Sequence, residues 1–90
     1  MRTHVFRSAR YKIVESDRIK RDGYCDWRHK KGKKLWIKKS LSDEKRLEVL
    51  IHEGLHACLP DADEHTVQET AQDLALFLLR DGWGRSNRSS

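Results

Sequence analysis

The stretch Ile51-His52-Glu53-Gly54-Leu55-His56-Ala57 contains the pattern His-Glu-x-x-His, and the rest of the chain can be organised around it. Its apolar spacing predicts that it lies inside a helix. Residues four apart lie one above the other on a helix, so His52 and His56 share a face and can bind one metal ion. Glu53 lies at the edge of that face, where it can accept a proton from a metal-bound water.

The two histidines lie on a different side of this helix from its main apolar stripe. At about 100° per residue, one broad face collects the residues that we expect to meet the core: Leu47, Leu50, Ile51, Gly54, Leu55 and Cys58. His52 and His56 point roughly the opposite way, beside Val49 and Leu59. A merely solvated face seldom carries such apolar neighbours, so the phase favours a partly covered metal site over two incidental surface histidines.

The chain has 90 residues, which suggests one small domain. We assign residues 1–84 to this domain and residues 85–90 to a disordered polar tail. A bound metal would help to stabilise so small a fold. No apolar run approaches membrane-spanning length, and residues 1–10 lack the apolar segment of a signal peptide. We therefore expect a cytoplasmic protein with no membrane partner.

Charge is unevenly distributed along the chain. Residues 1–40 contain 14 Lys or Arg and 4 Asp or Glu, whereas residues 41–80 contain 3 and 9. The acidic half carries the His-Glu-x-x-His pattern, and acidic surroundings raise the local concentration of a divalent cation. The basic half suits nucleic acid or an acidic protein, while lysines on a strand also serve simply to prevent edge-to-edge aggregation.

Three segments have the composition of β-strands, namely residues 11–15, 24–29 and 34–38. Residues 30–33 form a connection of hairpin length between the last two. Val5 and Phe6 are a weaker candidate for an edge strand. Gly23, which ends a polar turn, is expected to take a positive φ.

The aromatic and cysteine residues of this half allow more than one role. Trp27 and Trp36 fit either face of the sheet and are also candidate platforms for stacking bases. Cys25 and Cys58 are not spaced as a metal-binding pair, so we expect two free, partly buried thiols.

Two helices follow the predicted strands. Ser42 is a favourable N-cap, and the segment from Pro60 to Asp63 ends the first helix near Leu59. The second helix is expected from Glu64 to Arg80, with an inward stripe of Val67, Ala71, Leu74 and Leu78 and with Thr70 and Phe77 alongside. The sequence therefore predicts an α+β fold in which a small antiparallel sheet of about three strands precedes two helices.

The third metal ligand is less clearly marked than the histidines. Extending the inward stripe of the second helix backward reaches Glu64, beside the end of the first helix, where a metal would satisfy a buried carboxylate. An ordinary first-turn Glu favoured by the helix dipole is the alternative. His65 and Glu69 are rival ligands, and Asp63 is a more distant one.

His52, Glu53 and His56 resemble the signature of the zincin metallopeptidases. The helix that follows resembles the gluzincin-like branch, in a minimal form of the kind encoded by bacteria and their phages. The third-ligand patterns of the metzincins are absent, because Leu59 stands where they have Gly and Ala62 where they have His.

The resemblance implies a bound Zn²⁺ whose third ligand comes from the following helix, where the inward stripe favours Glu64. If a phage encodes the chain, the expected location is the host cytoplasm. It also implies that the strand before the active-site helix, here residues 35–39, is a sheet edge that pairs with an extended peptide substrate. Zincins often add a Tyr or His that stabilises the oxyanion, for which Tyr24 and His29 are candidates by residue type alone.

The function expected from these residues is that of a zinc metallopeptidase, a hydrolase in which Glu53 is the general base. The alternative is a non-catalytic, metal-stabilised binding module that uses its basic hairpin for nucleic acid or an acidic protein. The same site chemistry would also serve hydrolysis of RNA or another non-peptide substrate. The oligomeric state is not indicated by the sequence.

Overall fold

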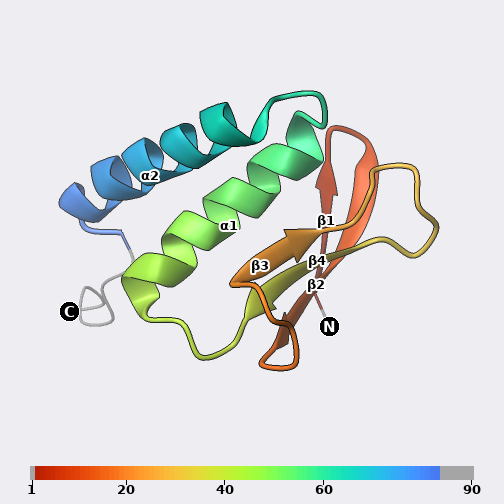
Figure 1. The fold of residues 1–90 in the computed structure, drawn as a ribbon, viewed down its shortest axis with the longest axis horizontal. Coiled ribbons are helices and arrows are strands. Elements are labelled where there is room, and N and C mark those ends of the chain that lie inside the picture. Colours follow the sequence, from red (N-terminus) through yellow and green to blue (C-terminus); the bar gives the residue numbers. More distant parts are fainter. Residues whose placement is uncertain (1, 84–90) are drawn as a thin grey trace.

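The structure, a computed structural model, describes residues 2–83 (Figure 1). Its elements, in chain order, are β1 (Arg2–Phe6), β2 (Ala9–Ser16), β3 (Gly23–Cys25), β4 (Lys34–Lys38), α1 (Asp43–Cys58) and α2 (Glu64–Arg80). A small sheet thus precedes two helices, and the predicted α+β class is confirmed. The predicted tail, residues 85–90, lies outside the described residues.

The sheet differs from the prediction in strand number and in one pairing. Its order is β1-β2-β4-β3, and β2 pairs with β4 in parallel while the other two pairings are antiparallel. The additional strand is β1, which forms a hairpin with β2. The predicted strand at residues 24–29 is shorter in the structure and ends at Cys25, after which the Asp26 carboxylate accepts a hydrogen bond from the Lys34 N–H at 2.9 Å.

The position of β4 corrects the prediction of the substrate-binding edge. β4 lies between β2 and β3, so residues 35–39 are not a sheet edge. The outer strands are β1 and β3, and β3 is the one that runs across α1 near its histidines. Any extended peptide that pairs with the sheet beside α1 would therefore pair with β3.

The core lies between the sheet and α1, which itself lies between the sheet and α2 (Figure 1). Its buried members are Ala9, Tyr11, Leu35, Ile37, Val49 and Ala57. The predicted core stripe of α1 is therefore wrong in phase. Leu50 does pack on this core, but Val49 and Ala57 are the buried apolar residues of α1. A helix with neighbours on two sides has no single apolar stripe, which explains the error.

Both predicted helix starts are confirmed by their caps. The Ser42 hydroxyl accepts a hydrogen bond from the Lys45 N–H at 3.2 Å, and the Asp63 carboxylate accepts one from the Thr66 N–H at 3.0 Å. Each cap satisfies an N–H group that a helix leaves without an internal partner.

The predicted stripe of α2 is only partly confirmed. Val67 and Ala71 are buried, and Ala75 joins them, but Leu74 and Phe77 are exposed. Within residues 2–83 the main packing partner of α2 is α1, so only a narrow strip of α2 is covered. In the same range, no helix is long and apolar enough to cross a membrane.

Candidate metal centre

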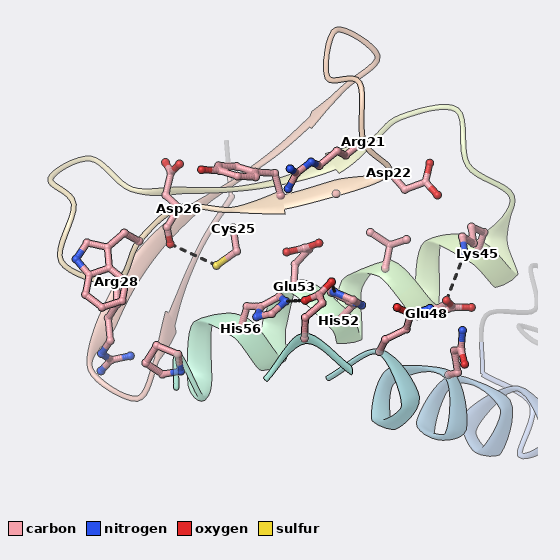
Figure 2. Close-up of a pocket in the computed structure, with 18 residues that line it drawn as sticks. Arg21, Asp22, Cys25, Asp26, Arg28, Lys45, Glu48, His52, Glu53 and His56 are labelled. Carbon is pink, nitrogen blue, oxygen red and sulfur yellow. Dashed lines mark hydrogen bonds and ion pairs between the residues drawn. The ribbon is translucent and has the colours of Figure 1, made fainter. Parts of the chain in front are cut away.

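Three predicted metal-binding side chains meet between the two helices. The His56 Nε2 atom lies 2.6 Å from Glu64 Oε1, and His52 Nε2 lies 3.2 Å from Glu64 Oε2. One ligand atom from each of these residues lies within 4.8 Å of the others. In Figure 2 both histidines project from α1 into the space beneath β3. The structure therefore brings together the two histidines and the carboxylate that the sequence favoured.

The helix hairpin explains why Glu64 reaches this point. Asp63 caps α2, so Glu64 is its first residue and lies beside the last turns of α1. The Asp63 carboxylate is occupied by the N–H and hydroxyl of Thr66, and these hydrogen bonds hold the pKa of Asp63 below its ordinary value. Asp63 acts as a cap and does not join the cluster.

The other rival ligands also lie apart from the cluster. His65 Nε2 lies 3.4 Å from Glu69 Oε2, and both side chains are well exposed on α2. They pair with each other one helical turn apart. Neither belongs to the His/Cys/Asp/Glu group that could hold a metal within residues 2–83.

Glu53 lies next to the cluster in a different environment. It is only 7% exposed, in contrast with the exposed Glu64. Burial and, to a lesser extent, the negative charge of Glu64 raise the pKa of Glu53 to about 7, against the opposing effect of Arg21. A carboxyl group with a pKa near neutrality can both accept and release a proton there, which suits acid–base chemistry.

Gly23 covers Glu53 from the sheet side. A Cβ atom at Gly23 would lie 2.6 Å from Val49 Cγ1 and 2.9 Å from Glu53 Cγ. The prediction of a positive φ at Gly23 is wrong, since the glycines with positive φ in the described chain are Gly32 and Gly82. Glycine is required here because the β3 backbone approaches α1 closely, and that approach buries Glu53.

A cleft of about 730 Å³ opens along the cluster. Its lining includes β3 on one side, the α1 histidines and Glu53 below, and Glu64, Gln68 and Gln72 of α2 on the other side. Figure 2 places Arg28 and Lys45 at opposite ends of this space. The cleft is thus an elongated trough that passes over Glu53, with cationic side chains at its ends.

Neither candidate for oxyanion stabilisation points toward the metal cluster, although Tyr24 contributes to the lining of the cleft. A Cβ at Gly23 would point toward α1, and side chains alternate along a strand. The side chain of Tyr24, the next residue, therefore points to the sheet face away from α1, as does that of its register partner Trp36. The ring of His29 packs edge-on against Trp27 at 5.1 Å between centroids, and His29 does not line the cleft.

Arg28 is an important residue of this region that the sequence did not indicate. Its guanidinium donates to the carbonyls of Phe6 at 3.2 Å and Ala57 at 3.1 Å, and to the carbonyl of Arg7. Arg7 in turn donates to the Cys58 carbonyl at 2.9 Å. These cations satisfy carbonyls at the C-terminal end of α1, directly after His56. No local sequence pattern marks such long-range contacts.

Cys25 and Cys58 are free thiols, as expected. Cys25 lines the cleft and lies 3.5 Å from the Asp26 carbonyl. Burial, together with the nearby charge of Glu53, raises the pKa of Cys25 to about 11, although a bond with Tyr11 opposes this. Nucleophilic attack requires the thiolate, so Cys25 is a weak nucleophile at neutral pH.

We therefore predict that Cys25 resists alkylation in the folded protein. In a Cys58→Ser variant, iodoacetamide at about pH 8 should react with Cys25 at least roughly tenfold more slowly than after unfolding, because an unperturbed thiol has a pKa of about 8.5. The rate should rise as the pH approaches 11. Mass spectrometry measures the modified fraction, and equal rates in the folded and unfolded protein would contradict the raised pKa.

No family model, curated protein or solved structure matches this chain. Among the residues that the fold brings together, the clearest candidate site is the cluster of His52, His56 and Glu64. The buried Glu53 lies beside it.

Proposed function

We propose that this protein is a zinc-dependent hydrolase of the metallopeptidase type. The observation that supports the proposal most directly is the meeting of His52 and His56 on the two oxygens of one carboxylate, Glu64. Two histidines and a Glu are a ligand set found in catalytic zinc sites. Such sites use three protein ligands and keep a position for water or substrate.

The donor atoms fit zinc in type and arrangement. Imidazole nitrogen and carboxylate oxygen both suit Zn²⁺, and the ligand atoms lie near enough together to share one ion. Bound there, zinc would supply a Lewis acid that acidifies water and polarises a carbonyl. His52 and His56 each contact Glu64 through the atoms that would bind the ion, and zinc binding would replace these contacts.

Glu53 is the proposed general base. It follows His52 in the sequence. Burial beneath β3 raises the pKa of its carboxyl group to about 7. It can hold a proton taken from water and return it to a leaving group within the same trough.

The proposed substrate is an extended peptide that pairs with β3. β3 is an outer strand of the sheet and lines the cleft over Glu53. An outer strand can supply main-chain hydrogen bonds to an added strand without requiring a particular side-chain sequence. This arrangement would lay the peptide along the trough between β3 and α2.

Metal content tests the ligand assignment. Glu64→Ala should lower bound zinc from about one ion per chain to well below that, because it removes one of three ligands. Glu69→Ala is the matched control, since both carboxylates lie on α2 and their side chains are 66% exposed. Plasma mass spectrometry after dialysis measures the zinc.

His52→Ala should behave as Glu64→Ala does, and His65→Ala should behave as Glu69→Ala does. Each removes an imidazole, but only His52 belongs to the cluster. Full zinc in all four variants, or none in the unaltered chain at a modest excess of zinc, would reject the proposed site.

A non-catalytic, metal-stabilised module is the second candidate function. It is favoured by the position of Glu64 on α2, because a metal shared with α1 would fasten the two helices together. In that case Glu53 has no chemical role, and its replacement by Gln would change neither metal content nor partner binding.

A further inference from the structure

The sheet has a second face, directed away from α1. Strand residues alternate between the two faces, and register partners share a face. Gly23 would direct a Cβ at Val49 and Glu53 of α1, so Tyr24, the next residue, points outward together with its partner Trp36. By the same alternation Lys34 and Lys38 of β4 point outward, as do Arg10 and Lys12 of β2. We call these six residues the outer-face set.

The outer-face set combines cations with aromatic rings. Lys12 is the register partner of Lys34, and the Lys34 Nζ lies 5.4 Å from the centroid of Trp36. Tyr24 lies on the neighbouring strand β3. The guanidinium of Arg21, which precedes that strand and also lines the cleft, lies 5.8 Å from the centroid of the Tyr24 ring. The other outward residues of the four strands are uncharged, so these strands contribute no carboxylate to the outer face.

Both helices lie on the other side of the sheet (Figure 1). The sheet contacts of the helices in the described chain come mainly from α1, which covers the inner face. Tyr24 is 44% exposed, whereas Trp36 is half-buried between its neighbours. The outer face therefore presents a row of two rings, set across adjacent strands and flanked by cations.

We propose that this outer face binds single-stranded nucleic acid. Bases without a pairing partner can stack on exposed aromatic rings, and cations beside the rings neutralise the phosphates that join those bases. Register partners on adjacent strands have Cβ atoms about 4.5–5.5 Å apart, so Tyr24 and Trp36 form a continuous platform. Four-stranded sheets with surface aromatics serve RNA recognition in this way. A duplex, whose bases are already stacked, could use only the cations.

The sequence suggested Trp27 and Trp36 as stacking platforms, and the structure changes this pair. Trp27 follows the end of β3 and packs against His29 at the cleft side. Tyr24 takes its place as the neighbour of Trp36. The proposed surface and the proposed metal centre lie on opposite faces of the sheet, so either proposal can fail without the other.

Fluorescence anisotropy of labelled oligonucleotides tests the proposal with the full chain. The probes are oligo-dT and oligo-rU of about 12 nucleotides, and a duplex of similar length. We expect the protein to bind the single strands more tightly than the duplex. The affinity for the single strands should fall steeply as the salt concentration rises from about 50 to 200 mM. Tighter binding to the duplex would overturn the proposal.

Matched substitutions locate the site. Tyr24→Ala should weaken single-strand binding roughly 5- to 150-fold, the range for loss of one stacked base, whereas Phe77→Ala on α2 should leave it unchanged. Trp36→Ala should also weaken binding, whereas Trp36→Phe, which keeps an aromatic ring, should retain most of the affinity. This pair separates loss of stacking from loss of the fold. Lys12→Glu should weaken binding more than Arg80→Glu, although both alter net charge equally.

Two further results would overturn the stacking surface. One is equal weakening by Lys12→Glu and Arg80→Glu with no effect of Tyr24→Ala, which would indicate non-specific attraction to a basic protein. The other is competition by polyglutamate as effective as that by oligo-dT, which would indicate an acidic protein as the partner.

Discussion

Replacing Glu53 by Gln should abolish peptide hydrolysis while leaving zinc bound. Gln has nearly the same shape as Glu but cannot accept the proton that the proposed mechanism assigns to this buried carboxyl group. We expect turnover of a casein or fluorogenic peptide substrate to fall about 10²- to 10⁴-fold, the usual contribution of a general base. Zinc content should stay at the value of the unaltered chain, because Glu53 is not in the ligand cluster.

A second readout shows whether the substitution acts through the proposed chemistry. In metal-free protein the raised pKa of about 7 means that the folded state holds a proton on Glu53 that the unfolded state has released above about 4.5. The stability of that protein should therefore fall as the pH rises from about 4.5 to 7. In Glu53→Gln this part of the decrease should be absent. Unchanged turnover in Glu53→Gln would reject the catalytic role.

Replacing Gly23 by Ala should destabilise the fold and disturb the trough together. The added Cβ would lie 2.6 Å from Val49 Cγ1, a contact that the structure can relieve only by moving β3 away from α1. Overpacking of this kind typically costs about 1–3 kcal/mol. Urea unfolding of the zinc-free and zinc-loaded protein measures the loss, and hydrolytic activity should fall because β3 no longer seals Glu53.

Gly54→Ala is the matched control. A Cβ at Gly54 would lie 3.7 Å from Phe6 Cε1, an ordinary van der Waals contact, and Gly54 lies within α1. Ala is favoured over Gly in a helix interior by roughly 0.5–1 kcal/mol, so this variant should be more stable than the parent chain. If both substitutions shifted stability in the same direction, the close approach of β3 at Gly23 would be the wrong explanation.

The sequence predicted the helical half of the fold well because its signals are local. The caps at Ser42 and Asp63, and Pro60 between the helices, fix the helix limits through contacts a few residues apart. The turn between α1 and α2 also places Glu64 beside His52 and His56. Three of the proposed site residues could therefore be predicted from the sequence.

The sheet was predicted less well because its pairings join distant parts of the chain. The β1–β2 hairpin was not recognised because its turn uses Arg7 and Ser8, at φ values of 46° and 75°, where Gly or Asn is the usual signal. The parallel pairing of β2 with β4 inserts β4 between β2 and β3. Strand composition alone does not specify that order, and the error about the outer strand followed from it.

The packing of α2 on α1 would link the proposed metal binding to the mobility of α2. α2 carries the third proposed ligand, yet within the described chain it packs mainly on α1 and adds little to the sheet core. Such a peripheral element can detach without global unfolding. Zinc that binds only the docked form would stabilise docking by RT ln(1 + [Zn]/Kd), about 2.7 kcal/mol at a hundredfold excess over Kd. Amide hydrogen exchange in α2 would then slow roughly a hundredfold with zinc, so availability of the metal would set how often this helix opens.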